Sequence, residues 1–366
     1  MAEHQGIEIE KGVAYLYFAY DVGFSIDLNL AQKKIAQITE RARIRQNKRS
    51  PWYFEFEPAP LKINHSFPEL EIGGFKTLPE AEATIFDFGA ISISIKMPYN
   101  GNLETLVDMS YALYEDEQIE RQCRYLVENL TNVIKDAINK LEISEHFEEY
   151  KIFQIVKYES TAELTDMVKK YGKTLARILR SENQELSEDE TRDATWSYIS
   201  YAPNDLLLID WNTAILIDET SDDVRAVLEF VNVELLELSY LDLNLDNSLD
   251  RAYEVVSRLA KKRIQFPGHV TNELRRIGRL QVESAFLFEG INNALKLLGD
   301  QYLARVYRLA STRFHLPEWD TTILRKISAL ESIYEKINDQ ASIFRAEILE
   351  WIIILLILVS LFLPHR

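Results

Sequence analysis

The side chains best suited to chemistry in this chain of 366 residues are few and widely separated. Its six histidines show no metal-ligand spacing, apart from His146, which lies three residues before Glu149. Its one cysteine, Cys123, lies in a helical pattern that lacks any motif for an activated thiol. We therefore interpret His146 and Glu149 as the solvated end of a helix, and Cys123 as a buried or inert thiol.

Other patterns that often carry catalysis or metal binding are also weak here. The 12 glycines are scattered and form no phosphate-binding loop. The acidic run Glu182–Asp193 lacks the Asp and Gly spacing of a calcium loop, so we interpret it as a solvated linker. The segment Arg313–Trp319 is interpreted as a turn that Phe314 and Trp319 hold in place, although it also concentrates reactive side chains, and Trp319 is kept as a candidate contact. We expect no catalytic residue, no metal and no cofactor; an enzyme whose site the sequence does not reveal stays open as an alternative.

A basic run offers one candidate for nucleic-acid binding. Lys33–Arg49 holds seven Lys or Arg against one acid, and the aromatic stretch Pro51–Phe54 follows directly. Basic residues beside aromatic rings can bind an RNA backbone and stack on its bases. The simpler interpretation, which we prefer, is the solvated face of a helix that leads into a strand. Arg41, Arg43 and Arg45 are kept as candidate contacts.

Composition limits the partners and the compartment of the chain. The 47% of hydrophobic and 27% of charged residues are typical of a folded protein, and the net charge is −17. A chain this acidic is repelled by DNA and by anionic lipid headgroups unless a local basic patch exists. A single cysteine excludes an internal disulfide, and the N-terminus shows no signal or presequence pattern. We expect the bulk of the chain to lie in a cytosol.

The elements that would position these residues alternate between strand and helix in the first half. Isoleucines and serines alternate near residue 92, which predicts a strand with one buried and one polar face. Strand–helix alternation at this spacing favours layered α+β or α/β architecture. We expect strands at Gly12–Val22, Ala83–Ile95 and Lys151–Tyr158, and helices at Leu30–Arg45, Asn102–Leu141 and Thr161–Arg180.

A β-hairpin and a helix follow the acidic run. The hairpin covers Thr195–Asp210, and a second turn at Asp210–Asn212 leads into another strand. Trp211 at the tip of that turn is either a contact residue or a side chain packed on the neighbouring layer. Ser221 with the acids after it predicts an N-cap for a helix over Val224–Leu243.

The last third is predicted to be helical. We expect one helix at Ser248–Ile264 and then an antiparallel hairpin of two helices, the second starting near Pro317. In that second helix, apolar residues recur at steps of four and three, which is the pattern of a coiled-coil seam. The seam residues are Ile323, Ile327, Leu330, Tyr334, Ile337 and Phe344.

The seam leads without a breaker into an apolar tail. The uncharged run covers roughly 20 Å as a helix, against about 30 Å of bilayer hydrocarbon. Because the tail is apolar on all sides, three interpretations stay open: a membrane anchor, which we favour, a helix in the core of an oligomer, or a helix buried in the monomer. The predicted anchor residues are Trp351, Ile352, Ile353, Ile354, Leu355, Leu356, Ile357, Leu358, Val359, Leu361, Phe362 and Leu363.

The expected fold class is therefore α+β, with N-terminal and central α/β layers followed by an antiparallel helical (coiled-coil) hairpin and a C-terminal transmembrane helix. The expected domains are an α/β head at 1–182, a hairpin and helix completing it at 183–246, a helical stalk at 247–347 and the anchor at 348–366.

Several segments resemble the "required for meiotic nuclear division" family of membrane-anchored proteins, whose biochemistry is unknown. They are the end Leu349–Ile357, the strand Phe86–Ile93, and Asp210–Ala214 and Leu228–Leu238, which look like a bacterial relative. The resemblance covers most of the chain and is strongest after about residue 200. It implies membrane anchoring and oligomerisation, and supplies no catalytic residues. The chain lacks the presequence of the family's mitochondrial members.

Three functional hypotheses follow. The first is a single-pass, tail-anchored membrane protein whose cytoplasmic α/β head acts as a non-catalytic scaffold or tether for an unknown protein partner. The second is a homo-oligomeric membrane transport or channel component. The third is an RNA- or ribosome-associated protein that uses Lys33–Arg49, which predicts binding that weakens steeply with salt.

Overall fold

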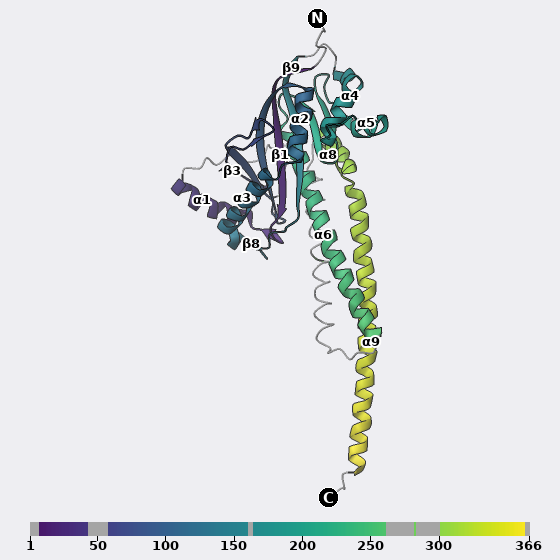
Figure 1. The fold of residues 1–366 in the computed structure, drawn as a ribbon. Helices are drawn as coiled ribbons and strands as arrows, with labels where there is room; N and C mark the ends of the chain where they lie inside the picture. Colours follow the sequence, from purple (N-terminus) through teal and green to yellow (C-terminus); the bar gives the residue numbers. More distant parts are fainter. Residues whose placement is uncertain (1–6, 43–57, 160–163, 261–281, 283–300, 363–366) are drawn as a thin grey trace. The chain divides into compact units, whose positions relative to one another are not determined.

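In a computed structural model, the chain is described over residues 7–42, 58–159, 164–260, 282 and 301–362 (Figure 1). It divides into two compact units, each made from two stretches of sequence. The first unit is Met1–Tyr240 with Leu287–Pro317, and the second is Leu241–Phe286 with Glu318–Arg366. The domain boundaries expected from the sequence stay predictions.

The first unit is built on one large mixed sheet. Its eight strands lie in the order β10-β11-β12-β9-β1-β7-β6-β3. The central strand β1 is antiparallel to both β7 and β9, whereas β12 runs parallel to β9. The strands are β1 (Glu8–Asp21), β3 (Leu61–Ser66), β6 (Glu80–Ile85), β7 (Ala90–Asn102), β9 (Phe147–Glu159), β10 (Tyr198–Ile199), β11 (Leu206–Ile209) and β12 (Thr213–Ile217). Two short pairs join β2 (Ser25–Ile26) to β8 (Ile138–Asn139) and β4 (Glu71–Ile72) to β5 (Phe75–Lys76).

Helices cover both faces of this sheet. One face is apolar: Leu16 of β1 lies opposite Ile95 of β7, and both belong to the large core that also holds residues of the first four helices. The opposite face carries Ala19 and Ala90, which pack against Phe230 in a second core. The helices of the first unit are α1 (Leu28–Ala42), α2 (Leu103–Tyr114), α3 (Gln118–Ile134), the short 3₁₀ helix η1 (Lys135–Ala137), α4 (Leu164–Arg180), α5 (Glu188–Thr195), α8 (Gln301–Arg313) and the first part of α6 (Asp222–Ala260).

The strand expected at Ala83–Ile95 is a hairpin instead. β6 ends at Ile85 and β7 begins at Ala90, with the turn closed by a hydrogen bond from the N–H of Phe86 to the carbonyl of Ala90. Gly89 makes the turn possible because its φ of 109° is in the region that favours glycine. The polar face exists, but Ser92 and its strand neighbours are buried, because a helix covers that side too.

Two other local expectations need correction. The single helix expected over Asn102–Leu141 is broken into α2 and α3, and Asn102 caps α2 by accepting from the N–H of Thr105. The acidic run expected as a linker forms α5 from residue 188 onward, because Ser187 accepts from the N–H of Glu190 and the acids lie in the first turn.

The second unit contains the end of α6 and most of α9 (Leu316–Phe362). The helix expected at Ser248–Ile264 is the continuation of α6, which runs unbroken to Ala260. Lys326 of α9 forms ion pairs with Asp242 (2.7 Å) and Asp246 (2.6 Å) of α6, so these two segments lie against each other. The first helix of the expected hairpin, which the apolar pattern places at Leu274–Leu309, falls largely outside the described residues.

The predicted seam is wholly or partly buried where its side chains are described. Ile323, Leu330 and Tyr334 are buried, and Ile327 is partly buried. The side chains of Ile337 and Phe344 lie outside the described part.

The expected transmembrane helix is wrong. Within the described residues, no helix of the protein has the length and apolar character that a membrane span requires. The uncharged stretch Trp351–Phe362 is only about 18 Å long, against about 30 Å of bilayer hydrocarbon. Extending it toward the N-terminus brings in Glu350, Glu347 and Arg345. The predicted single-pass, tail-anchored protein with its bulk in the cytoplasm depended on this helix and is corrected with it; Leu363 lies outside the described residues.

Replacing Gly89 by alanine should destabilise the first unit strongly. A Cβ at Gly89 would lie 1.8 Å from the carbonyl oxygen of Gly23, so the hairpin would have to move. The alanine would also be held at a positive φ that is strained for any residue with a Cβ. Gly74→Ala is the matched control, because Gly74 also has positive φ (84°) but has nothing within 4 Å of the added methyl group. Urea unfolding should show a loss of more than about 2 kcal/mol for Gly89→Ala and about 1–2 kcal/mol for the control. Equal losses would contradict the steric argument.

Candidate functional site

A buried carboxylate held by two arginines lies beside the turn between β11 and β12. The side chain of Asp210 has no solvent exposure, and its oxygens lie 2.7 Å from Nε of Arg180 and 2.7 Å from Nη2 of Arg313. The N–H of Trp211 also donates to Asp210 Oδ1 at 2.7 Å. Asp210 thus joins the turn to the ends of α4 and α8.

A second carboxylate extends the cluster to α5. Asp193 Oδ2 lies 2.6 Å from Arg180 and 2.9 Å from Arg313, so each arginine contacts both acids. The hydrogen bond from Arg313 lowers the pKa of Asp193. Burial raises the pKa of Asp210, and the charges of Arg313 and Arg180 oppose that effect. Every charge of the cluster faces an opposite charge, which is the arrangement of a structural junction rather than of an open reactive site.

Aromatic contacts support the same junction. Tyr150 of β9 donates to the carbonyl of Asp210 (3.1 Å), and its ring packs edge-on against Phe314 at 5.0 Å between centroids. Phe314 is buried, as expected for the turn after α8, and His315 follows it with φ of 57°. Trp211 is 49% exposed beside this junction. Its role as a contact residue stays a prediction.

The sequence-based interpretation missed this cluster. It assigned Asp210 to a turn, which the hydrogen bond to the N–H of Trp211 supports, but it did not connect Asp210 with Arg180 or Arg313. No spacing rule could have done so, because Asp210 and Arg313 are separated by 103 positions. The available signal was an arginine at the last position of each of two amphipathic helices.

The other residues singled out from the sequence lie apart from one another. Cys123 is buried in α3, which confirms the expected buried thiol, and burial raises its pKa well above the usual value. His146 lies just before β9 rather than on a helix, and its Nε2 is within 3.1 Å of Glu148 and 2.8 Å of Ser239. Trp319 is half-buried in α9.

The three arginines of the basic run fall at the edge of the described part. Arg41 lies in the last turn of α1, where its side chain is not described, and Arg43 and Arg45 lie outside the described residues. Nucleic-acid binding through Lys33–Arg49 therefore stays a prediction.

A layer of buried polar groups lies between α6 and the sheet. Glu229 of α6 is buried and lies 3.7 Å from Lys62, which also pairs with Glu82 at 3.0 Å. One turn earlier, the guanidinium of Arg225 lies 4.0 Å from the ring centroid of Tyr15. Burial raises the pKa of Glu229, against the opposing charge of Lys62.

The same helix carries a second buried acid, Glu237. Burial raises the pKa of Glu237 well above its usual value, and the nearby charge of Asp21 raises it further. Two buried carboxylates close together are most easily accommodated when they hold a proton between them. Within the described residues, no group of three or more His, Cys, Asp or Glu side chains is arranged to hold a metal ion.

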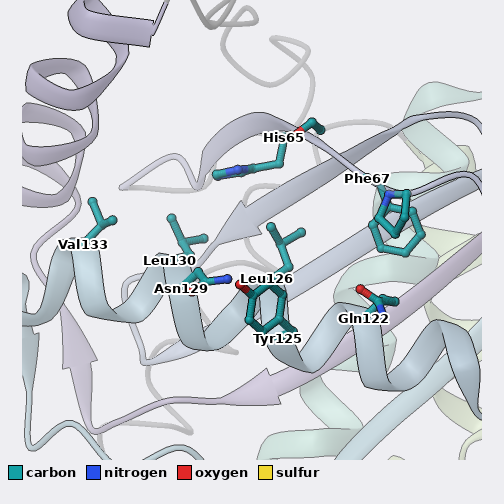
Figure 2. Close-up of a pocket in the computed structure, with 10 residues that line it drawn as sticks. His65, Phe67, Gln122, Tyr125, Leu126, Asn129, Leu130 and Val133 are labelled. Atoms are coloured by element: carbon teal, nitrogen blue, oxygen red, sulfur yellow. The ribbon is translucent and has the colours of Figure 1, made fainter.

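A pocket of about 290 Å³ lies between the end of β3 and α3 (Figure 2). His65 and Phe67 form the wall on the strand side, and Leu126 and Leu130 point from α3 toward the ring of His65. Burial lowers the pKa of His65, so its imidazole is neutral at neutral pH. The other lining residues are Ser66, Pro68, Gln122, Tyr125, Asn129 and Val133.

The C-terminal part of α9 is an exposed apolar surface. Every side chain from Trp351 to Val359 is between 45% and 71% exposed, and none of them is charged or polar. Scattered exposed apolar side chains are ordinary, but a continuous exposed stretch of this kind is a candidate surface for contact with another molecule.

Comparisons with known proteins identify a family without a described activity. The family model "Uncharacterized protein MJ0711, N-terminal domain" matches residues 11–223, from β1 to the start of α6. The chain is also similar to "Uncharacterized protein MJ0711" of Methanocaldococcus jannaschii, with 24% identity over 244 residues, which cover 65% of this chain and 72% of that protein. No solved structure matches. These matches do not address the resemblance to the meiotic-division family, which stays a prediction.

Removing Arg313 should destabilise the junction around Asp210. Arg313→Met leaves a buried acid with one of its two cationic partners, and such losses cost about 3–5 kcal/mol. The matched control is Arg192→Met, since Arg192 is exposed and forms an ion pair with Asp189 at 3.2 Å on the same helix. The control should change the free energy of unfolding by no more than about 0.5 kcal/mol. Urea titration followed by tryptophan fluorescence measures both, and equal midpoints would refute a structural role for the cluster.

Replacing Glu237 by glutamine should make stability less sensitive to pH. The pKa of Glu237 is raised in the folded chain, whereas an unfolded glutamate titrates near about 4.3. Between those two values the folded state binds one more proton, so the free energy of unfolding falls as pH rises, by about 1.4 kcal/mol per unit. Glu237→Gln removes this loss, so the stability of the variant relative to the parent chain should increase as pH rises above the unfolded value of about 4.3. Urea unfolding across that range tests this, and parallel curves for the two chains would contradict it.

Proposed function

The chain belongs to the family described as "Uncharacterized protein MJ0711, N-terminal domain", and we propose that it is a non-catalytic scaffold that assembles through the C-terminal part of α9. Its heads, formed by the first unit, would then be presented in several copies. The observation that carries this proposal is the continuous exposed apolar surface from Trp351 to Val359.

The covering surface is a second copy of the same helix. A helix that is apolar on all sides is stable only when it is enclosed, and covering one leucine or isoleucine side chain contributes about 1.5–3 kcal/mol. Identical copies meet this need without any polar match, whereas the net charge of −17 opposes contacts between the rest of the chains. Apolar helices therefore supply the attraction, and the acidic heads stay apart.

The heptad pattern favours more than two copies. The steps of four and three that place Leu330 and Tyr334 in the seam continue through Trp351, Leu355 and Leu358. A dimer would cover only the stripe formed by Trp351, Leu355 and Leu358, and would leave the rest of the apolar surface in water. An assembly of three or more helices encloses a larger part of each helix.

The head supports a binding role more than a catalytic one. Two of its charged clusters are built around buried carboxylates, Asp210 and Glu229, which are closed by ion pairs. They position helices against the sheet. The channel alternative depended on the transmembrane helix that has been corrected, and RNA binding stays a prediction for Lys33–Arg49.

Charges in the helix stripe should abolish assembly, whereas a charge on the opposite side should not. We expect Leu355→Glu with Leu358→Glu to give a monomer, because the stripe would then bury two carboxylates. Ser360→Glu is the matched control: its helical position lies opposite the stripe, and its hydroxyl donates to the carbonyl of Ile357 within the same helix. Sedimentation equilibrium of the full chains should show an assembly for the parent and for the control, and a monomer for the double variant. A monomeric parent chain at about 100 µM, where even weak self-association is populated, would refute the proposal.

A further inference from the structure

β3 is an edge strand with one paired side. It stands at one end of the sheet order and pairs with β6 through the register Leu61↔Ile85 to Ser66↔Glu80. On its other side, no strand is paired to it in the part of the chain that the structure describes. Such an edge presents backbone groups to which another chain can add as a strand.

The register shows which backbone groups face outward. The N–H of Phe67 donates to the carbonyl of Pro79 at 3.1 Å, which extends the ladder by one residue beyond Ser66. In an antiparallel ladder, alternate residues point both backbone groups to the partner strand and the residues between them point both away. The N–H and carbonyl groups of Lys62, Asn64 and Ser66 therefore face outward.

The pocket lies where a side chain of an added strand would project. Side chains of directly opposed residues in neighbouring strands lie on the same face of a sheet. A residue opposite His65 would therefore project toward α3, where the pocket lies between His65 and the leucines Leu126 and Leu130 (Figure 2).

The lining of the pocket defines the side chain that it suits. Among the described residues, no charged side chain lines it, and the imidazole of His65 is neutral because burial lowers its pKa. The rings of Phe67 and Tyr125 favour an aromatic guest, and the amides of Gln122 and Asn129 offer hydrogen bonds to its polar edge. A charged side chain would lose its hydration there without gaining a partner.

We propose that the edge of β3 and this pocket bind an extended peptide segment of another protein, which adds to the sheet as a strand and places an uncharged aromatic side chain in the pocket. Strand addition of this kind takes its affinity from backbone hydrogen bonds and its specificity from side-chain pockets. This site extends the scaffold proposal, because it names the class of partner that each head binds. It rests on that proposal only for its biological purpose.

The test uses the full chain and labelled six-residue peptides that carry threonine at every position except one. We expect the peptide with a central tryptophan to bind, and those with lysine or glutamate at that position to bind at least about tenfold more weakly, as measured by fluorescence anisotropy. The tryptophan peptide with N-methylated backbone should lose binding, because it cannot donate to the strand edge.

Two variants of the chain separate strand addition from simple occupation of the pocket. Asn64→Pro removes an outward N–H without breaking the ladder to β6, and should weaken binding by about tenfold or more, whereas Asn64→Ala keeps the N–H and should bind like the parent. Asn129 is exposed on the pocket rim, so Asn129→Trp should block the pocket and weaken binding of the tryptophan peptide. Circular dichroism melting confirms that each variant is folded.

The proposal is overturned by either of two results. If none of the peptides binds below about 1 mM, the site does not bind peptides. If the N-methylated peptide or N-acetyltryptophanamide binds as well as the tryptophan peptide, and Asn64→Pro has no effect, the pocket is a small-molecule site. The binding assay is repeated with Leu355→Glu and Leu358→Glu in the same chain, so that failure of self-assembly and failure of peptide binding are told apart.

Discussion

The structure depends on the burial of both faces of the central strands, one of which is polar. β1 and β7 place Leu16 and Ile95 in the apolar core on one side and Tyr17 and Ser94 on the other. A sheet face that carries hydroxyl groups and charges can be covered only by a helix that brings matching polar groups. α6 does this with Arg225 and Glu229 at adjacent turns, next to Tyr15 and Lys62, while Phe230 on the same helix packs against Phe86.

A separate set of contacts explains why the first unit includes α8, a stretch from late in the sequence. α8 lies against the part of the sheet near β11, and three contacts hold it there. Arg313 pairs with Asp210 at 2.7 Å, the hydroxyl of Tyr307 donates to Glu234 at 2.8 Å, and the ring of Tyr302 lies 5.2 Å from that of Tyr201. Because these contacts combine charge, hydrogen bonding and apolar packing, they specify one position for α8 more narrowly than apolar contact alone would.

The strands and helices with a clear period were predictable from sequence. The aromatic and β-branched stretch Gly12–Val22 and the amphipathic pattern over Thr161–Arg180 correspond to β1 and α4. The prediction of one strand over Ala83–Ile95 failed because the turn within it depends on a single glycine at positive φ. Apolar residues on both sides of that glycine concealed the turn. The acidic run was taken for a linker because its charges outweighed the N-cap signal of Ser187. Hydropathy alone also overstated the tail, whose apolar run is too short to cross a bilayer.

The candidate sites were less predictable than the fold. The cluster around Asp210 joins residues that only the tertiary fold brings together, and Arg180 and Arg313 look like ordinary helix ends in the sequence. The pocket beside His65 depends on an edge strand and a helix that are separated by more than 50 residues. Periodicity reports which face of an element is buried, but it does not report which elements meet.

The most direct test of the account is the distance between copies of α9 in solution. A spin label can be attached selectively to the cysteine of Ser360→Cys, because the natural Cys123 is buried and does not compete for the label. Packed helices lie about 8–10 Å apart, so double electron–electron resonance between labelled chains should give a distance peak at roughly 15–30 Å, and the peak should vanish on dilution with unlabelled protein. A featureless decay at high concentration of labelled chain would show that the apolar helices do not meet, and would contradict the assembly proposed here.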